Sequence, residues 1–208
     1  MIRRVAALAA GLTVMLIVDA SPLAHLDHHL LTAHMVQHLL LMLVTAPLIL
    51  FAARSILARW RPQLTLCWLA GTVTVLAWHV PAVLELALRS HYWHEFEHAS
   101  FFLAGIVFWW PVFQPAPYSH WSVPVYLFLA TLPCDALSAF LAFCGHVVYR
   151  PYLSVRAGLI GLSPLDDQAL AGALMWVTVT FAYLIPALVL TARLLSGERR
   201  YAARILVS

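Results

Sequence analysis

The chain has 208 residues, of which 63% are hydrophobic and only 10% are charged, and its net charge of +3 arises from twelve Arg with no Lys. Soluble domains are usually about 45–50% apolar and about 25% charged. The composition therefore excludes an ordinary soluble enzyme, a disordered chain and a disulfide-stapled secreted domain, and it indicates a protein embedded in the lipid bilayer. The Arg residues form no patch or stripe, so we expect no nucleic-acid partner. Since no linker or repeat divides the chain, we predict one transmembrane domain over residues 1–208.

The hydropathy pattern predicts an all-α fold, a polytopic membrane helical bundle with six transmembrane helices, because each span needs about 20 apolar residues. The predicted spans cover residues 5–20, 30–53, 64–88, 94–113, 123–148 and 168–195. The first has the positive start and apolar middle of a cleavable signal peptide, but we favour a retained helix.

The distribution of Arg predicts how the bundle is oriented. Nine of the twelve Arg lie at one set of helix ends and in the two terminal segments, and only Arg89, Arg150 and Arg156 lie at the opposite ends. The Arg-rich side of a membrane protein usually faces the cytoplasm. We therefore expect both termini to be cytoplasmic, in a multi-pass protein of the bacterial inner (cytoplasmic) membrane.

Histidine is unusually abundant for a chain with so few charged residues, at eleven in total. On the predicted topology, only His120 falls on the cytoplasmic side. The other ten lie in the outer half of the bundle or in the outer loops: His25, His28, His29, His34, His38, His79, His91, His94, His98 and His146. Because these residues come from distant parts of the chain, their convergence on one side indicates a shared use.

Two pairs of histidines, His34 with His38 and His94 with His98, have the i, i+4 spacing that places both imidazoles on one helix face. Two such pairs on facing helices can ligate metal. Imidazole suits zinc, copper, iron and nickel, whereas thiolate and thioether ligands favour Cu(I). Sulfur-containing side chains lie deeper in the same half of the bundle, so we predict copper, with zinc as the alternative.

The predicted metal-binding residues fall into two groups. The main site comprises His34, His38, His94 and His98, with His79 and Asp167 as ligands or as partners that orient ligands. The residues predicted for a secondary role in metal capture or release are His25, His28, His29, His146, Met42, Met175 and Cys134.

Two other functions fit parts of the sequence. Residues 94–98 satisfy both H-E-x-x-H and its inverted form H-x-x-E-H, so an intramembrane zinc metalloprotease is one alternative, although it leaves His34 and His38 unused. A b-type haem or quinone electron-transfer protein is another, with His79 or His98 as axial ligand. Asp135 lies near the middle of a predicted span, where a charge is costly and usually functional.

Several segments resemble, in order, the motifs of the CtaG family of assembly factors for caa3-type cytochrome c oxidase. They are residues 34–44, beginning His34-Met35-Val36-Gln37-His38; Trp78-His79-Val80-Pro81; Glu97-His98-Ala99-Ser100-Phe101 with Phe108-Trp109-Trp110-Pro111; Tyr149-Arg150-Pro151-Tyr152; and Asp166-Asp167-Gln168 with Gly172, Met175 and Trp176. The similarity runs from about Ser21 to the C-terminus.

The resemblance implies a non-enzymatic helper in the maturation of a haem-copper oxidase, which delivers or holds copper on the outer side of the membrane. The partners that it implies are oxidase subunits or copper chaperones. A homo-oligomer is a further expectation.

Overall fold

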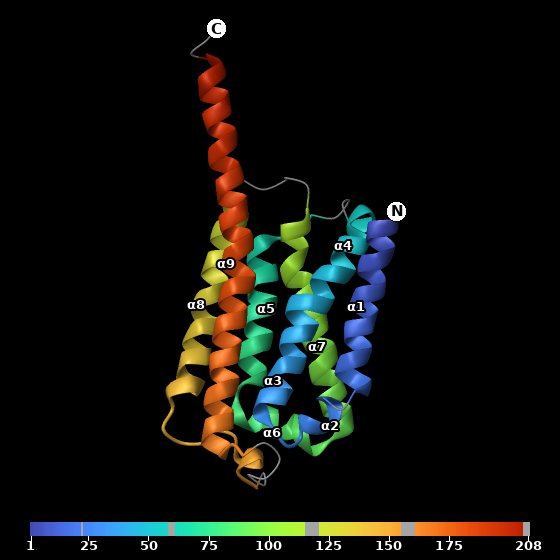
Figure 1. Ribbon diagram of the computed structural model, residues 1–208, viewed down its shortest axis with the longest axis vertical. Coiled ribbons are helices and arrows are strands. Elements are labelled where there is room, and N and C mark those ends of the chain that lie inside the picture. The colour runs from blue at the N-terminus through green and yellow to red at the C-terminus, as the bar shows by residue number, and fades with distance from the viewer. Residues whose placement is uncertain (22, 58–60, 115–120, 155–160, 206–208) are drawn as a thin grey trace.

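A computed structural model describes residues 1–21, 23–57, 61–114, 121–154 and 161–205, with side chains described through residue 196 except at residue 154. Within these ranges all regular structure is helical, and the long helices run side by side in one bundle (Figure 1). The elements are α1 (Ile2–Ala20), α2 (Leu23–Leu26), α3 (Leu31–Leu39), the π-helix η1 (Leu40–Thr45), α4 (Ala46–Leu57), α5 (Leu64–Trp78), α6 (Pro81–Arg89), α7 (His91–Trp109), η2 (Trp110–Phe113), α8 (Ser122–Phe143), η3 (Arg150–Ser154) and α9 (Pro164–Ile205).

In the described ranges, five helices are long and apolar enough to cross a membrane, and the bent pair α5–α6 makes a sixth if it counts as one span. The second of the five is continuous from Leu31 to Leu57 through the π-helix. The start of α1 and the end of α9 point toward the same end of the bundle, and α2 and α6 lie at the opposite end (Figure 1). The all-helical fold agrees with the hydropathy pattern, and the five or six candidate spans are compatible with the six predicted.

The third predicted span, residues 64–88, is two helices rather than one continuous helix. It breaks between Trp78 and Pro81, and α6 turns by 74° from the direction of α5. Proline has no backbone N–H, and its ring clashes with the helix turn before it, whereas it fits well at the first position of a new helix. As a result α5 has only 15 residues, which at 1.5 Å each is about 22 Å and shorter than the bilayer core of about 30 Å. The break leaves His79 at the junction.

The other expected helix boundaries also shift. The fifth predicted span, residues 123–148, ends as a helix at Phe143, and the sixth, residues 168–195, begins earlier at Pro164 and continues to Ile205. The segment between α8 and α9 therefore lies outside the spans. It contains His146, Tyr149 and Tyr152, which shape the end of the bundle described below.

The continuous segment from α3 through η1 to α4 forms the middle of the bundle and contacts α1, α7 and α9. Small residues allow the closest approaches. A Cβ on Gly105 of α7 would lie 2.9 Å from the Cβ of Ala46, and a Cβ on Gly172 of α9 would lie 2.6 Å from the backbone nitrogen of Ala142. Close backbone contact through small residues is typical of helix packing in membranes.

Candidate metal centre

The two predicted histidine pairs face each other across the interface of α3 and α7. Within a pair, the ring centroids are 4.4 Å apart for His34 and His38 and 4.3 Å apart for His94 and His98. Across the interface they are 5.8 Å apart for His34 and His94 and 5.7 Å for His38 and His98. All four side chains are buried. The convergence that the i, i+4 spacings predict is therefore present in the structure.

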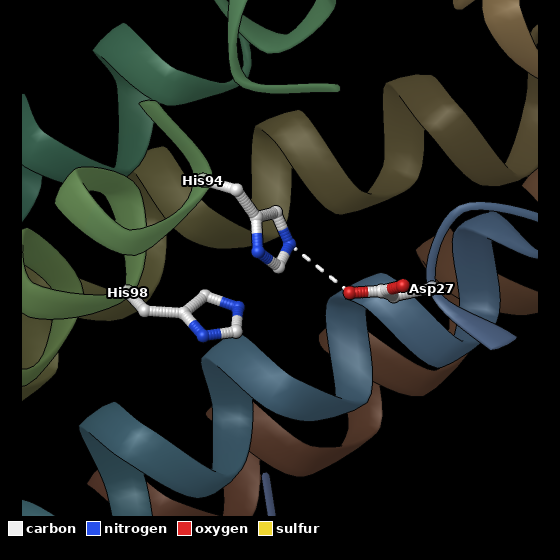
Figure 2. A group of neighbouring side chains, drawn as sticks. All are labelled: Asp27, His94 and His98. Carbon is white, nitrogen blue, oxygen red and sulfur yellow. Dashed lines mark ion pairs between the residues drawn. The ribbon is translucent and has the colours of Figure 1, made fainter. Parts of the chain in front are cut away.

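Two buried carboxylates complete this group. Oε1 of Glu97 lies 3.3 Å from Nε2 of His34 and 3.4 Å from Nε2 of His38. Oδ2 of Asp27, from the turn before α3, lies 3.0 Å from Nε2 of His94 (Figure 2). We call His34, His38, His94 and His98, with Asp27 and Glu97, the histidine cluster.

Sequence reasoning missed Asp27 and gave Glu97 only a role in the protease motif. A signal for Glu97 was present, since it lies three residues after His94 and so shares its helix face. The sequence indicates a ligand role for Asp27 only weakly, because Asp27 is a single acidic residue among the loop histidines. A third carboxylate, Asp19 at the end of α1, lies at the margin of the cluster, with Oδ1 3.3 Å from Nδ1 of His98.

The histidine cluster holds several buried polar atoms that have no hydrogen-bond partner among the described residues. They are Nδ1 of His34, Nδ1 of His38, Nε2 of His98 and Oε2 of Glu97. Buried polar groups are nearly always satisfied, because leaving one unpaired costs about 1–3 kcal/mol. In each of two groups of three residues, the potential ligand atoms lie within 4.8 Å of one another. One group is Asp27, His94 and His98, and the other is His34, His94 and Glu97. The donor set thus fits a cation of the kind that imidazole and carboxylate bind.

The electrostatics of the loop beside the cluster are consistent with this. Burial alone would raise the pKa of Asp27, but the neighbouring His94, His28 and His34 outweigh it and lower that pKa. Burial likewise lowers the pKa of His28, against the opposing charge of Asp27. Asp27 therefore ionises more readily than a free carboxyl and His28 protonates less readily than a free imidazole, and the deprotonated form of each is the one that binds metal.

The segment between α8 and α9 contacts the backbone of residues in and beside the cluster through two tyrosines. The hydroxyl of Tyr152 donates to the carbonyl oxygen of Asp27 at 2.9 Å, and that of Tyr149 donates to the carbonyl oxygen of His79 at 3.1 Å. Burial raises the pKa of both phenols, so they remain protonated donors. Gln168 links the same segment to α9, because its Oε1 accepts from Val148 N at 2.7 Å.

Asp167, predicted as a ligand or as a partner of one, has different contacts. Its Oδ2 accepts from Leu31 N at 2.6 Å, and its Oδ1 accepts from Thr32 N at 3.1 Å. These are the free N–H groups of the first turn of α3, so the carboxylate caps that helix. Asp167 belongs to neither of the two potential ligand sets. Its contacts indicate a role in fixing the helix that carries His34 and His38.

The motif histidines, His34, His38, His79 and His98, thus meet near one end of the bundle, whereas the motif residues 108–111 lie at the far end of α7. The family model of the cytochrome c oxidase caa3 assembly factor (Caa3_CtaG) matches residues 1–196. The chain belongs to this family. The match includes α1, which the motif resemblance from about Ser21 onward leaves out. No curated protein and no solved structure matches the chain.

In this assembly factor, the remaining predicted histidines lie at the edge of the cluster or beyond it. His25, His28 and His29 are exposed in and after α2, and of these His28 comes closest, with its ring centroid 5.4 Å from that of His94. His146 is exposed, and its Nδ1 lies 3.4 Å from Sγ of Cys144. His120 lies outside the described residues.

His79 and the predicted sulfur-containing residues of the assembly factor share one small cavity beside the cluster. This cavity of about 30 Å³ is bordered by Met35, His38, Met42, His79, Cys134 and Met175, and aliphatic and aromatic side chains, Tyr183 among them, complete the wall. Nδ1 of His79 is 2.7 Å from the carbonyl oxygen of Val75, and its Nε2 has no partner among the described residues.

The alternative functions meet structural obstacles. Glu95, which would be the base in H-E-x-x-H, is 54% exposed and lies 3.9 Å from His91, away from the cluster. Only in the inverted motif, H-x-x-E-H, is the acid buried in the histidine cluster, because that acid is Glu97. For haem, the cavity beside His38 and His79 is far too small, since about 30 Å³ holds little more than one water molecule.

Asp135 is half-buried between α8 and α9, where it accepts a hydrogen bond from Thr180 at 3.0 Å.

Proposed function

We propose that this caa3 oxidase assembly factor binds copper in the histidine cluster and holds or delivers it for the oxidase. The observation that carries the proposal is the buried group of four imidazoles and two carboxylates with several unpartnered nitrogen and oxygen atoms. Such a group is costly unless a cation completes it. Nitrogen and oxygen donors alone also accommodate zinc, but the adjoining sulfur-lined cavity favours copper.

The side chains have distinct tasks in this proposal. His94, His98 and Asp27 form the ligand set nearest the loop, and the exposed His28 beside His94 offers the first contact for an arriving ion. His25 and His29 add donors to the same loop. Glu97 contacts both His34 and His38, so it fixes the orientation of their rings and raises their basicity as ligands.

The cluster faces the outer side of the membrane in this proposal. Arg3 and Arg4 at the start of α1 and Arg54 near the end of α4 share the end of the bundle that holds both termini, and Arg4 donates to Ser55 there. Positive charge marks the cytoplasmic side of bacterial inner-membrane proteins. The opposite end, with α2, α6 and the cluster, is then open to copper from outside and to the outer face of an oxidase subunit or a copper chaperone.

Metal analysis of the purified full-length protein tests the proposal directly. We expect copper in the wild type and a lower copper content in His94→Ala and His98→Ala. His91→Ala is the matched control, because His91 lies on the same helix but is 80% exposed and outside the cluster. Absence of copper from the wild type, or full retention in both cluster variants, would overturn the assignment. Zinc in place of copper, with peptide cleavage lost in Glu97→Gln, would support the protease instead.

The link to the oxidase needs a second readout. In cells that lack their own assembly factor of this family, the wild-type chain should restore copper content and activity of the caa3 oxidase, and His91→Ala should match it. His94→Ala should fail to restore either. Equal restoration by His94→Ala would separate the assembly role from copper binding at the cluster.

A further inference from the structure

The cavity beside the histidine cluster has an unusual wall for a membrane bundle. Four sulfur-containing side chains and two imidazoles border the same space of about 30 Å³: Met35, Met42, Cys134, Met175, His38 and His79. They come from α3, η1, α8, α9 and the break between α5 and α6. Segments that are far apart in the chain thus place these six side chains around the same cavity.

A single methionine in a core is usually a flexible space-filler. Two features separate this group from ordinary packing. First, the chain has only five Met, and three of them border this cavity. Second, the two imidazoles of the wall have buried ring nitrogens without hydrogen-bond partners among the described residues, Nε2 of His79 and Nδ1 of His38.

We propose that this cavity is a second metal site, specific for Cu(I), and that it receives the ion from the histidine cluster. The inference rests on the proposed copper function of the cluster. Thioether and thiol groups are soft ligands that select Cu(I), while the harder divalent ions prefer nitrogen and oxygen. The cavity volume suits one small ion or one water.

His38 belongs to both sites. Its Nε2 lies 3.4 Å from Oε1 of Glu97 in the cluster, and its ring also borders the cavity. The ring is stacked on Phe101, with centroids 3.9 Å apart, which holds it in this shared position. Transfer then consists of ligand exchange: the bonds from copper to Asp27 and to the other cluster imidazoles break as Cu–S bonds to Met42 and Met175 form. The ion stays Cu(I), so no electron is needed. The thioethers release no proton, and protons from water restore the charge balance of the carboxylates that the ion leaves.

The π-helix η1 begins two residues after His38 and contains Met42. A π-turn displaces the ladder of backbone hydrogen bonds, and such turns occur often at functional sites. Here the carbonyl oxygen of Met42 accepts a hydrogen bond from Nε1 of Trp109 at 3.0 Å. The widened turn is thereby stabilised while Met42 remains at the wall of the cavity.

The test uses full-length protein in detergent, loaded anaerobically with Cu(I) from a chromophoric chelator, and reads out copper stoichiometry and X-ray absorption. The wild type should bind two ions and show sulfur neighbours to copper. Met42→Leu with Met175→Leu, a nearly volume-conserving change, should lose one ion and the sulfur signal. Met15→Leu is the matched control, since Met15 lies on α1 outside the cavity wall. Cys67→Ala is the corresponding control for Cys134→Ala.

The outcomes separate this site from the cluster. Copper with only nitrogen and oxygen neighbours in the wild type, or an unchanged sulfur signal in the double Met variant, would overturn the cavity site and leave the cluster intact. Loss of the cluster ion alone in His94→Ala, with the sulfur-bound ion retained, would support two sites. A wild type that binds no Cu(I) would overturn both proposals. Unaltered thermal unfolding of the double variant checks that its loss of copper is not a loss of fold.

Discussion

The substitution Asp167→Asn distinguishes a helix cap from a metal ligand. Asp167 is only 3% exposed, and each of its oxygens accepts one backbone N–H at the start of α3. Asparagine has the same shape, but it replaces one oxygen with an NH₂ group that cannot accept. One of the two N–H groups therefore faces another donor in a buried position, and the charge that strengthened both hydrogen bonds is gone.

The expected loss of stability follows from these contacts. A hydrogen bond to a charged group contributes about 1.5–3 kcal/mol, and removing one of the two loses about that amount. For a chain of about 150–250 residues, 1 kcal/mol corresponds to about 2–4 °C, so the unfolding temperature should fall by about 3–12 °C. Copper content after purification at low temperature should stay close to wild type, because the cluster ligands remain.

Thermal unfolding of the detergent-purified protein and metal analysis of the same sample give both numbers. Asp166→Asn is the neighbouring control, since Asp166 is exposed and accepts mainly from Ser163, and it should shift the unfolding temperature less. If Asp167→Asn lost copper while its unfolding temperature matched the wild type, the capping argument would be refuted and the ligand role restored.

Three further predictions concern the cluster and the packing around it. Glu97→Gln should weaken copper binding about 10–100-fold in a chelator competition, because substitutions of groups that orient metal ligands typically cost that much. Gly172→Ala should destabilise by about 1–3 kcal/mol in thermal unfolding, since its methyl group would lie 2.6 Å from Ala142 N and must push α8 from α9. The lowered pKa of Asp27 implies stability that is fully present above its ordinary value of 3.8 and is lost as pH falls through the folded-state pKa. Asp27→Asn should therefore flatten the acid limb of a stability–pH curve.

The glycine and glutamate predictions each have a matched control. Gly145→Ala should be neutral, because no described atom lies within 4 Å of the position that its methyl group would take and the residue is exposed. Glu95→Gln is the control for Glu97, as Glu95 is exposed on the same helix. Wild-type affinity in Glu97→Gln, equal destabilisation by the two glycine variants, or an unchanged acid limb in Asp27→Asn would contradict the respective argument.

Hydropathy locates the apolar helices because lipid imposes one requirement on each span, an apolar stretch long enough to cross the bilayer. It is insensitive to direction, so it joins α5 and α6 into one span although α6 turns by 74°. The signal for the break is Pro81, which by itself predicts only a kink in the helix. A turn as large as 74° is stabilised by the packing of α6 against α7. A hydropathy window covers only neighbouring residues, so it does not detect this long-range contact.

The four core histidines could be predicted because the i, i+4 spacing fixes a helix face and alternating helix directions fix which ends meet. The carboxylates were harder, since an acid in a loop is normally solvated. Asp27 is instead fully buried, and the hydroxyl of Tyr152, 125 residues away in the chain, donates to its backbone carbonyl. The predicted topology places Asp167 near the cluster. Its contacts with the backbone of α3 depend on how far α9 is shifted along its axis relative to α3, and no sequence pattern predicts that shift.

The charges of the two proposed sites differ in a way that suits each to a separate task. The histidine cluster contains two buried carboxylates, Asp27 and Glu97, so a cation or protons must balance them, and uptake of metal would exchange one for the other. The cavity wall named above, by contrast, contributes thioethers, a thiol and imidazoles but no carboxylate. A divalent ion there would lack counter-charge, whereas a monovalent soft ion would gain its binding energy from sulfur. In the two-site proposal, the cluster therefore attracts the ion and the cavity selects Cu(I), with His38 as the residue that both sites share.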